Sequence, residues 1–201
     1  MYRKEWNSIE DMEGYLEEAF HVVNFMRTIV NSYVKETKLN FSLLASAAEG
    51  VTGNFAKYDL THKGKGMAVA EKGYYTNSFH VPVNVKMDYI EKIRFEGRFH
   101  HLCNGGSITY IELEEMPDGN MEPVQEIVEH AYNNDCNYMG MNFPLDNCCE
   151  CDYVGRILQK CPSCASSNVR RLRRVSGYLA EVDRFVQGKK FELMNRFHHN
   201  K

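Results

Sequence analysis

Hydrophobic residues recur at helical spacing in three parts of the chain, and each part predicts an amphipathic helix. The longest covers residues 8–36, where one apolar face is expected to be buried. A second helix is expected over residues 46–58, with Phe55 and Tyr58 on its apolar side. A third is expected over residues 121–134, where four residues share one side: Val124, Ile127, Val128 and Ala131.

Short apolar or alternating runs between these helices predict strands. Residues 41–45 form an apolar run typical of a buried strand, residues 107–113 alternate apolar and polar positions, and residues 138–143 form a further strand. Because helices and strands alternate from residue 41 to residue 143, an α/β layout is expected. The basic stretch at residues 170–179 has neither periodicity, so it is expected to be a loop around Gly177.

Composition places the chain among ordinary globular proteins. Its 201 residues fit one domain, or one domain with a small appendage, and a hydrophobic content of 43% suffices for a core. No apolar run approaches the roughly 20 residues of a membrane span, and the N-terminus lacks the apolar segment of a signal peptide. A cytoplasmic location is therefore expected, where the seven cysteines serve as ligands or free thiols rather than disulfides.

Four cysteines form two Cys-x2-Cys pairs, Cys148/Cys151 and Cys161/Cys164. Each pair places two thiolates on one side of a tight turn, and two such turns close the tetrahedron that Zn²⁺ prefers. Iron in the same sulfur cage is the chemical alternative. Because the protein fills all four positions, the metal is expected to be structural. The residue after each pair commonly adopts a left-handed conformation that suits glycine, and here those residues are Asp152 and Ala165.

Other potential metal ligands fit a site less well. Cys149 adjoins Cys148 and is an alternative ligand, although Cys149-x-Cys151 makes a poorer turn. His100, His101 and Cys103 also cluster in the sequence. Adjacent histidines on a strand point to opposite faces, so these residues are not expected to share an ion.

Two polar stretches have more than one interpretation. Thr76, Asn77 and Ser78 can line a pocket, or they can form an ordinary turn before a strand. The four arginines within residues 170–174 are expected to form a solvated face or a dock for a partner that reaches Gly177. A zinc ribbon that binds nucleic acid is the alternative, but the net charge of −3 argues against the wide basic surface it needs.

Three sequence features follow one another along the chain: Gly-Tyr-Tyr-Thr-Asn-Ser-Phe-His at residues 73–80, the four cysteines, and Arg-Val-Ser-Gly-Tyr-Leu at residues 174–179. Together they resemble the C-terminal part of anaerobic (class III) ribonucleoside-triphosphate reductases, from about residue 31 to residue 201. Two positions depart from the family pattern. Ser107 stands where a histidine usually follows two glycines, and Ala180 stands where glycine is common.

The resemblance implies a fold and three regions. Residues 1–145 are expected to form the C-terminal part of a ten-stranded α/β barrel of the glycyl radical enzyme type, together with the long N-terminal helix. Residues 146–170 are expected to form a small zinc ribbon with four cysteine ligands. Residues 171–201 are expected to form the glycyl radical loop and the C-terminal tail.

The resemblance also implies a chemistry. Gly177 is expected to carry a stable backbone radical, generated by a radical S-adenosylmethionine activating enzyme that holds an iron–sulfur cluster. The reaction would convert ribonucleoside triphosphates to deoxyribonucleotides for DNA synthesis. Thr76, Asn77 and Ser78 become candidates for the substrate pocket.

One essential part of the family machinery has no counterpart in this sequence. The family passes its radical to a cysteine in a loop upstream of the matched region, and neither Cys103 nor Cys136 matches that context. We therefore expect a complementary reductase chain to supply the thiyl cysteine. The alternatives are a stand-alone glycyl radical spare part and an inactive remnant.

Overall fold

The structure is a computed structural model that describes residues 9–48, 50–62, 68–117 and 119–199. Its helices are α1 Ile9–Thr37, α2 Val51–His62, α3 Ala68–Glu71, α4 Tyr89–His100, α5 Glu122–Asn133 and α6 Gln187–Asn195. Its strands are β1 Thr109–Glu112, β2 Met139–Asn142, β3 Leu145–Cys148, β4 Val154–Gly155, β5 Val169–Arg174 and β6 Leu179–Glu181. A 3₁₀ turn, η1, covers Val182–Arg184. None of the described helices is both long enough and apolar enough to cross a membrane.

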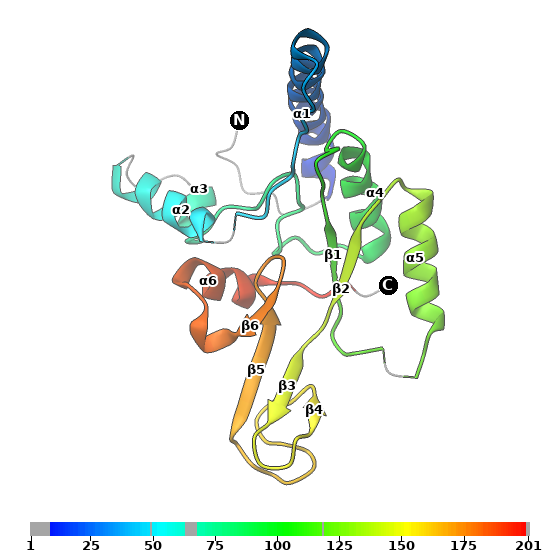
Figure 1. Ribbon diagram of the computed structural model, residues 1–201. Helices are drawn as coiled ribbons and strands as arrows, with labels where there is room; N and C mark the ends of the chain where they lie inside the picture. Colours follow the sequence, from blue (N-terminus) through cyan, green and yellow to red (C-terminus); the bar gives the residue numbers. More distant parts are fainter. Residues whose placement is uncertain (1–8, 49, 63–67, 118, 200–201) are drawn as a thin grey trace.

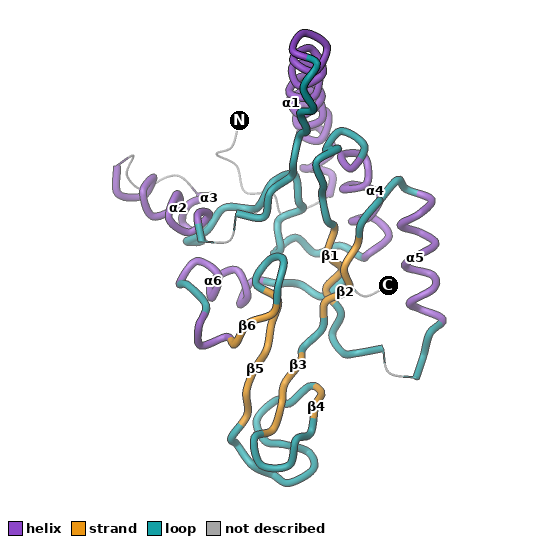
Figure 2. Tube along the Cα trace, in the orientation of Figure 1, coloured by secondary structure: helices purple, strands orange, loops and turns teal. Residues whose placement is uncertain are grey.

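The strands occupy the centre and lower part of the molecule, with helices on either side of the upper half (Figure 2). Helices α4 and α5 flank β1 and β2, whereas α2, α3 and α6 lie on the opposite side (Figure 1). Strands β1 and β2 pair in parallel and are joined through α5, which is the β-α-β arrangement. The mixed helix and sheet layout expected from the sequence is therefore confirmed.

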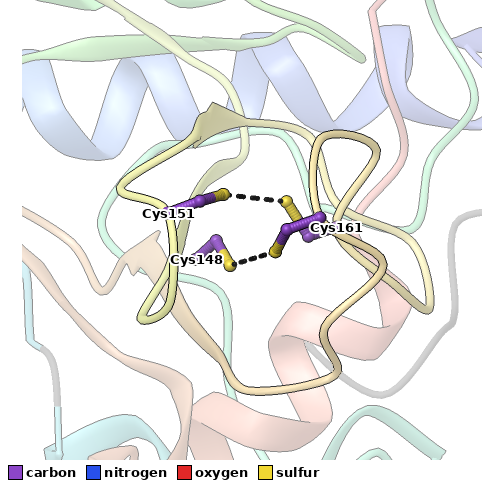
Figure 3. Close-up of side chains that lie close together, drawn as sticks. Cys148, Cys151 and Cys161 are labelled. Atoms are coloured by element: carbon purple, nitrogen blue, oxygen red, sulfur yellow. Dashed lines mark hydrogen bonds between the residues drawn. The ribbon is translucent and has the colours of Figure 1, made fainter.

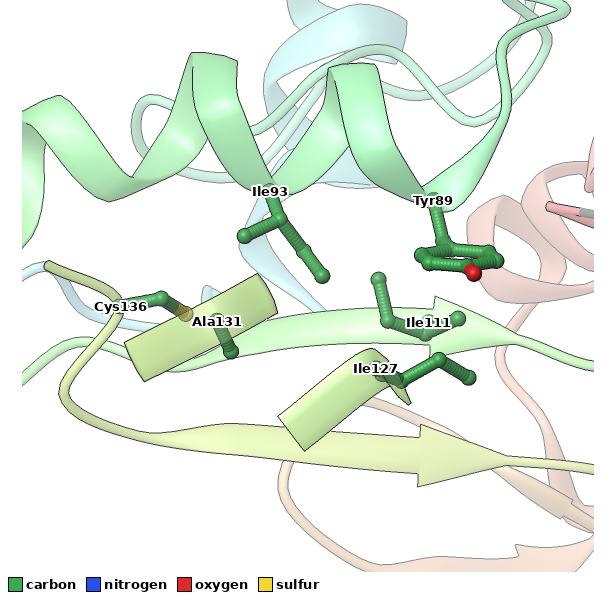
Figure 4. Packing of buried hydrophobic residues seen from close by; sticks show 6 residues of the cluster. All are labelled: Tyr89, Ile93, Ile111, Ile127, Ala131 and Cys136. Carbon is green, nitrogen blue, oxygen red and sulfur yellow. The ribbon is translucent and has the colours of Figure 1, made fainter. Parts of the chain in front are cut away.

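The main apolar core lies between α4, α5 and strand β1. Ile93 of α4 and Ile111 of β1 are fully buried, and Ile127 and Ala131 of α5 cover them. Figure 4 shows Ile93 and Tyr89 pointing from α4 toward Ile111. Val128 was expected on the same buried side of α5, but it is half exposed, so the buried face of that helix is narrower than predicted.

Helix α4 has no counterpart among the sequence predictions, and its buried face explains why. Lys92, Glu96 and His100 lie on that face together with Ile93 and Phe99. Charged residues interrupt the apolar period on which the prediction of a helix depends. Asp88 caps the helix, because its carboxylate accepts a hydrogen bond of 2.8 Å from the backbone N–H of Glu91.

Helix α1 has the predicted length, although position 8 lies outside the described residues. The expected apolar face is only partly covered. Leu16 is buried and Ala19, Val23, Val30 and Val34 are half-buried, whereas Met26 on the same face is exposed. Near Leu16, the ring centres of Phe20 and Phe99 lie 6.0 Å apart. The outer part of α1 projects from the rest of the molecule (Figure 1), and several of its apolar side chains, including Phe25 and Ile29, are exposed.

Two other predictions are corrected. Residues 41–45 do not form a buried strand, since Leu44 is exposed and makes only an isolated bridge with Gly106. Helix α2 begins at Val51 rather than residue 46, and Phe55 and Tyr58 are exposed. Its inward face consists of smaller residues because α2 meets α6 at close range: a Cβ atom on Gly53 would lie 3.0 Å from the Cα atom of Gly188.

The second sheet is antiparallel, in the order β4-β3-β5-β6. Part of the basic stretch expected to be a loop is strand β5, which pairs with β3 from Leu145↔Leu172 to Cys148↔Val169. Strand β5 then turns back through a tight hairpin into β6, with Arg174 opposite Leu179. Gly177 lies in this hairpin, and the cysteine pairs lie toward the other end of the same sheet.

Candidate functional site

The four cysteines of the two Cys-x2-Cys pairs meet at one point. Their sulfur atoms all lie within 4.8 Å of one another. The Sγ atoms of Cys148 and Cys164 are 3.5 Å apart, as are those of Cys151 and Cys161. Figure 3 shows the sulfur atoms directed toward a common centre. Four converging thiolates suit a tetrahedral metal ion such as Zn²⁺ and leave no position for substrate.

Backbone hydrogen bonds shape each cysteine pair. The N–H of Asp152 donates to the carbonyl of Cys148 at 3.1 Å, and the N–H of Ala165 donates to the carbonyl of Cys161 at 2.9 Å. Asp152 and Ala165 have φ values of 57° and 59°, the left-handed conformation expected after each pair. The second cysteine of each pair is thereby turned back toward the first.

The competing ligands remain outside this cluster. Cys149 is exposed, and its backbone N–H donates to the carbonyl of Asn168. His100 ends helix α4 instead of lying on a strand, and its Nε2 atom lies 3.0 Å from the hydroxyl of Thr109. Within the described part of the chain, the four cysteines are the only group of this kind with metal-binding geometry.

The arginines of β5 bind acidic side chains, so the predicted solvated face is wrong for Arg173 and Arg174, which are mostly buried, whereas the Arg170 side chain is exposed. Arg171 and Arg173 donate to Asp146 of β3, which is fully buried. Asp146 also accepts a hydrogen bond of 2.9 Å from the N–H of Ile157, in the segment between the cysteine pairs. Arg170 pairs with Glu181 of β6. These contacts join the cysteine cluster to the strand that leads to Gly177.

Two guanidinium groups hold the base of the Gly177 hairpin. Arg196 donates to the carbonyls of Arg174 and Val175, at 2.8 and 3.1 Å. Arg174 donates to the carbonyl of Ser176 at 3.1 Å. The N–H of Val175 donates to the carbonyl of Tyr178 at 2.9 Å, which closes the turn.

Arg174 is itself held in place by two residues of strand β1, Tyr110 and Glu112. Its guanidinium lies 3.6 Å from the centre of the Tyr110 ring and forms a buried ion pair with Glu112. Burial opposes ionisation of Glu112, but the charges of Arg174 and Arg196 outweigh it and hold the pKa of Glu112 below its usual value. The hairpin is therefore attached to β1 through largely buried charged groups.

Gly177 occupies its position without any steric need for glycine. A Cβ atom there would meet nothing within 4 Å, and its φ lies outside the left-handed range. The residue is exposed, although Val175 and Ser176 before it are buried. Neither packing nor backbone conformation in the described residues requires glycine here.

The polar motif at residues 76–78 lies close to this hairpin. Thr76 and Asn77 line a small cavity of about 50 Å³ that is also lined by Ser176. Thr76 and Ser78 line a larger cavity of about 650 Å³ beside α1 and α4. Asn77 also accepts a hydrogen bond of 2.9 Å from the backbone N–H of Ala48. The structure thus brings the three candidate pocket residues near the hairpin, with Thr76 shared by both cavities.

A protein-family model matches nearly the whole chain. The family model described as "Anaerobic ribonucleoside-triphosphate reductase" matches residues 4–199. The chain belongs to the anaerobic ribonucleoside-triphosphate reductase family. The enzyme of this name from Escherichia coli is 33% identical over 95% of the chain, and that from Enterobacteria phage T4 is 30% identical over 89%.

Solved structures of anaerobic ribonucleotide reductases share the fold. One matches 90% of the chain with a TM-score of 0.75 at 22% identity. Another, the Thermotoga maritima reductase in complex with dATP and CTP, matches 87% with a TM-score of 0.62 at 22% identity. The chain spans only 28% of the Escherichia coli reductase and 27% of the Thermotoga maritima structure.

The sequence analysis missed two residues that support the β5–β6 hairpin carrying Gly177. Glu112 and Arg196 were given no role, although both are buried. The signal for Arg196 was its place in the closing segment that resembles the reductases. For Glu112 the sequence held no such signal, because an acid in an alternating strand is normally taken to point outward to solvent.

Proposed function

We propose that this chain is the glycyl-radical-bearing part of an anaerobic ribonucleoside-triphosphate reductase. The observation that carries the proposal is the contrast at the hairpin. Two arginines fix the backbone up to Ser176, whereas Gly177 itself is free of any steric constraint that would select glycine. Family membership supplies the reaction class for a glycine presented in this way.

Glycine has a chemical advantage as a radical carrier. Loss of one hydrogen atom from its Cα leaves an unpaired electron that is shared with the adjoining amides. The centre must flatten for this sharing, and glycine has no Cβ to oppose flattening. In the proposed reaction the radical takes a hydrogen atom from a cysteine thiol outside this chain, and the resulting thiyl radical acts at C3′ of a ribonucleoside triphosphate.

The cysteine cluster has a structural role in this proposal. Cys148, Cys151, Cys161 and Cys164 would hold Zn²⁺, which would fasten the end of the sheet from which β5 runs to Gly177. The Asp146–Arg173 ion pair lies on that route and supports the connection. Zinc would take no part in the radical chemistry because all four of its positions would be filled by sulfur.

The remaining regions are assigned in the same way. Residues 1–145 would contribute parallel strands and helices to a ten-stranded barrel, residues 146–170 the zinc ribbon, and residues 171–201 the radical loop and tail. Thr76, Asn77 and Ser78 would line the ribonucleotide pocket. The exposed apolar side chains of α1, among them Phe25 and Ile29, would pack against the part of the reductase that supplies the thiyl cysteine. A cytoplasmic location fits this reaction and stays a prediction.

Oxygen-dependent cleavage tests the radical assignment. The chain would be activated anaerobically by a radical S-adenosylmethionine activase of an anaerobic reductase and then exposed to air. We expect mass spectrometry to find cleavage at Gly177 in the wild-type chain and an intact Gly177→Ala variant. A wild-type chain that stays intact, with an activase that cleaves its own reductase under the same conditions, would contradict the assignment.

A complementation assay tests the reductase part of the proposal. The activated chain would be mixed with an anaerobic reductase truncated before the matched region, with formate supplied as the two-electron reductant, and formation of dCTP from CTP would be measured. A split reductase predicts dCTP only in the mixture. Restored activity only with a full-length reductase cleaved at its own glycine would show the spare part, and no dCTP in either mixture would show a remnant.

A further inference from the structure

A buried carboxylate, Glu96 of α4, organises a polar cluster that the glycyl radical chemistry does not use. Its Oε1 atom accepts hydrogen bonds from Lys92 Nζ at 2.6 Å and from the N–H of Val81 at 3.0 Å. Its Oε2 atom accepts from the hydroxyl of Thr109 at 2.8 Å and lies 3.1 Å from Nδ1 of His80. Burial opposes ionisation, yet the charges of Lys92 and His80 hold the pKa of Glu96 far below its usual value.

The ionised carboxylate determines how His80 presents its ring. A carboxylate only accepts hydrogen bonds, so Nδ1 of His80 must carry the proton in this contact. The other ring nitrogen, Nε2, makes no hydrogen bond to any described residue. The ring lines both the small cavity and the large one, and its side chain is 17% exposed.

The support behind Glu96 is rigid and comes from separate elements. Thr109 of β1 donates to Glu96 and can therefore accept from Nε2 of His100, which lies 3.0 Å away. Nδ1 of His100 accepts from the N–H of Asn137 at 3.2 Å. Burial lowers the pKa of His100, which favours the neutral ring that this pattern needs. If the Lys92–Glu96 pair contributed only to stability, it would not need His80 as a further partner. His80 instead lies at the wall of both cavities, with its Nε2 atom not hydrogen-bonded to any described residue.

The large cavity has the size of a ligand pocket, and most of the side chains that line it are apolar. Its volume of about 650 Å³ lies within the range of roughly 300–1,000 Å³ typical of ligand pockets. Thr76 and Ser78 provide hydroxyl groups beside His80, and Phe79, stacked 4.8 Å from Phe99, provides an apolar wall. The small cavity, at about 50 Å³, holds little more than water.

We infer that Nε2 of His80 hydrogen-bonds an oxygen of the ribonucleotide in the large cavity, and that Glu96 is the positioning residue that aims it. The inference deepens the proposed function and rests on it. A neutral His80 accepts from a ribose hydroxyl, and a protonated His80 donates to a phosphate oxygen. Both are hydrogen bonds to a nucleotide oxygen. Cytidine, which has the ribose but no phosphate, and inorganic tripolyphosphate distinguish the two contacts.

Nuclear magnetic resonance of the histidine rings tests this directly in the wild-type chain. A long-range ¹H–¹⁵N spectrum is expected to show free His80 with its proton on Nδ1. Addition of CTP is expected to shift the Nε2 resonance of His80 and to leave exposed His101 unchanged. A response to cytidine alone would identify the ribose as the contact, and a response to inorganic tripolyphosphate alone would identify the phosphate.

Matched variants provide a second readout. His80→Asn keeps a donor near Glu96 but removes the group at the Nε2 position, so it is expected to bind CTP at least tenfold more weakly by calorimetry. Glu96→Gln is expected to lose the fixed Nδ1–H form in the ring spectrum and to weaken CTP less than His80→Asn. His101→Asn, at the exposed end of the same helix, is the control and should bind like wild type.

Two results would overturn the inference: no binding of CTP to the wild-type chain at millimolar concentration, or binding that leaves His80 Nε2 and the affinity of His80→Asn unchanged. The spectrum of the wild-type chain decides the matter even where a variant fails to fold. Failure here is separable from failure of the proposed function, because radical formation at Gly177 is measured in the wild-type chain without nucleotide.

Discussion

Arg174 and Glu112 form an ion pair beneath the hairpin that carries Gly177, with side chains only 13% and 8% exposed. Glu112 also accepts a hydrogen bond from Asn142 of β2, so one carboxylate ties the hairpin to both strands of the parallel pair. The position of Gly177 therefore depends on a residue far away in sequence, in β1.

Removal of Glu112 is expected to destabilise the chain strongly. Glu112→Ala leaves the Arg174 guanidinium buried without its carboxylate, and breaking such a pair costs about 3–5 kcal/mol. Urea unfolding followed by circular dichroism would measure the loss. Glu114→Ala, which removes an exposed partner of Arg156, is the control and should leave stability unchanged. Equal effects of the two substitutions would contradict the role given to the buried pair.

Three glycines are expected to respond differently to alanine. A Cβ atom on Gly97 would lie 2.0 Å from the carbonyl oxygen of Asn134, and one on Gly188 would lie 2.7 Å from the Cα atom of Gly53. Both substitutions force backbone to move and should cost about 1–3 kcal/mol or more. Gly177→Ala meets no atom within 4 Å and should change stability by less than about 0.5 kcal/mol. Thermal unfolding of the three variants would compare them, and a large loss in Gly177→Ala would show a structural need for that glycine.

Metal content should distinguish the clustered cysteines from their neighbour. Cys161→Ser removes one of four converging sulfurs, so we expect zinc to be lost and Tm to fall. Cys149→Ser changes an exposed cysteine outside the cluster and should keep one zinc per chain. Elemental analysis by mass spectrometry would measure the zinc. Zinc retained by Cys161→Ser but lost from Cys149→Ser would reverse the assignment of ligands.

Stability should fall with acid from near neutral pH because of His199. The N–H of Glu112 donates to Nδ1 of His199, and burial lowers the pKa of His199 to about 3. The unfolded chain then binds one more proton than the folded chain between about pH 6.5 and pH 3, so stability decreases as pH falls through that range, by at most about 1.4 kcal/mol per pH unit. Glu96 and Glu112, whose pKa values are lowered, add their loss only below about pH 4.5.

Substitution of His199 checks this origin. His199→Asn keeps a hydrogen-bond acceptor for Glu112 but cannot titrate, so the slope of stability between pH 6.5 and pH 5 should become smaller. His100, whose pKa is also lowered by burial, accounts for the slope that remains. Urea midpoints at several pH values would measure it. An unchanged slope in His199→Asn would show that other groups control the acid response.

The sequence was most informative where the geometry is local. Two Cys-x2-Cys turns place their own sulfurs, and the left-handed residues after them, Asp152 and Ala165, follow from the same short segments. Helix α4 could not be found from the spacing of apolar residues because Lys92 and Glu96 are buried on its inner face, where they pair with each other. Glu96 is also hydrogen-bonded to His80 and Thr109. Such partners are distant in sequence.

Two errors have the same physical cause. The spacing of apolar residues shows which face of α1 is apolar, but it does not show how fully that face is covered, and Met26 on it remains exposed. The arginines of β5 looked like a solvated loop because their acids, Asp146 and Glu112, come from other strands. Neither ion pairs between residues distant in sequence nor the extent to which a face is covered can be predicted from the local spacing of apolar residues.

Electron paramagnetic resonance of the activated chain is the most direct test of the glycyl radical. The chain would be incubated anaerobically with an anaerobic-reductase activase, S-adenosylmethionine and a reductant. We predict a doublet from the single hydrogen left on Cα of Gly177, which narrows in a chain made with deuterated glycine and is absent in Gly177→Ala. No signal from the wild-type chain, with zinc bound and an activase proven on its own reductase, or a signal that persists in Gly177→Ala, would contradict the assignment of Gly177 as the radical carrier.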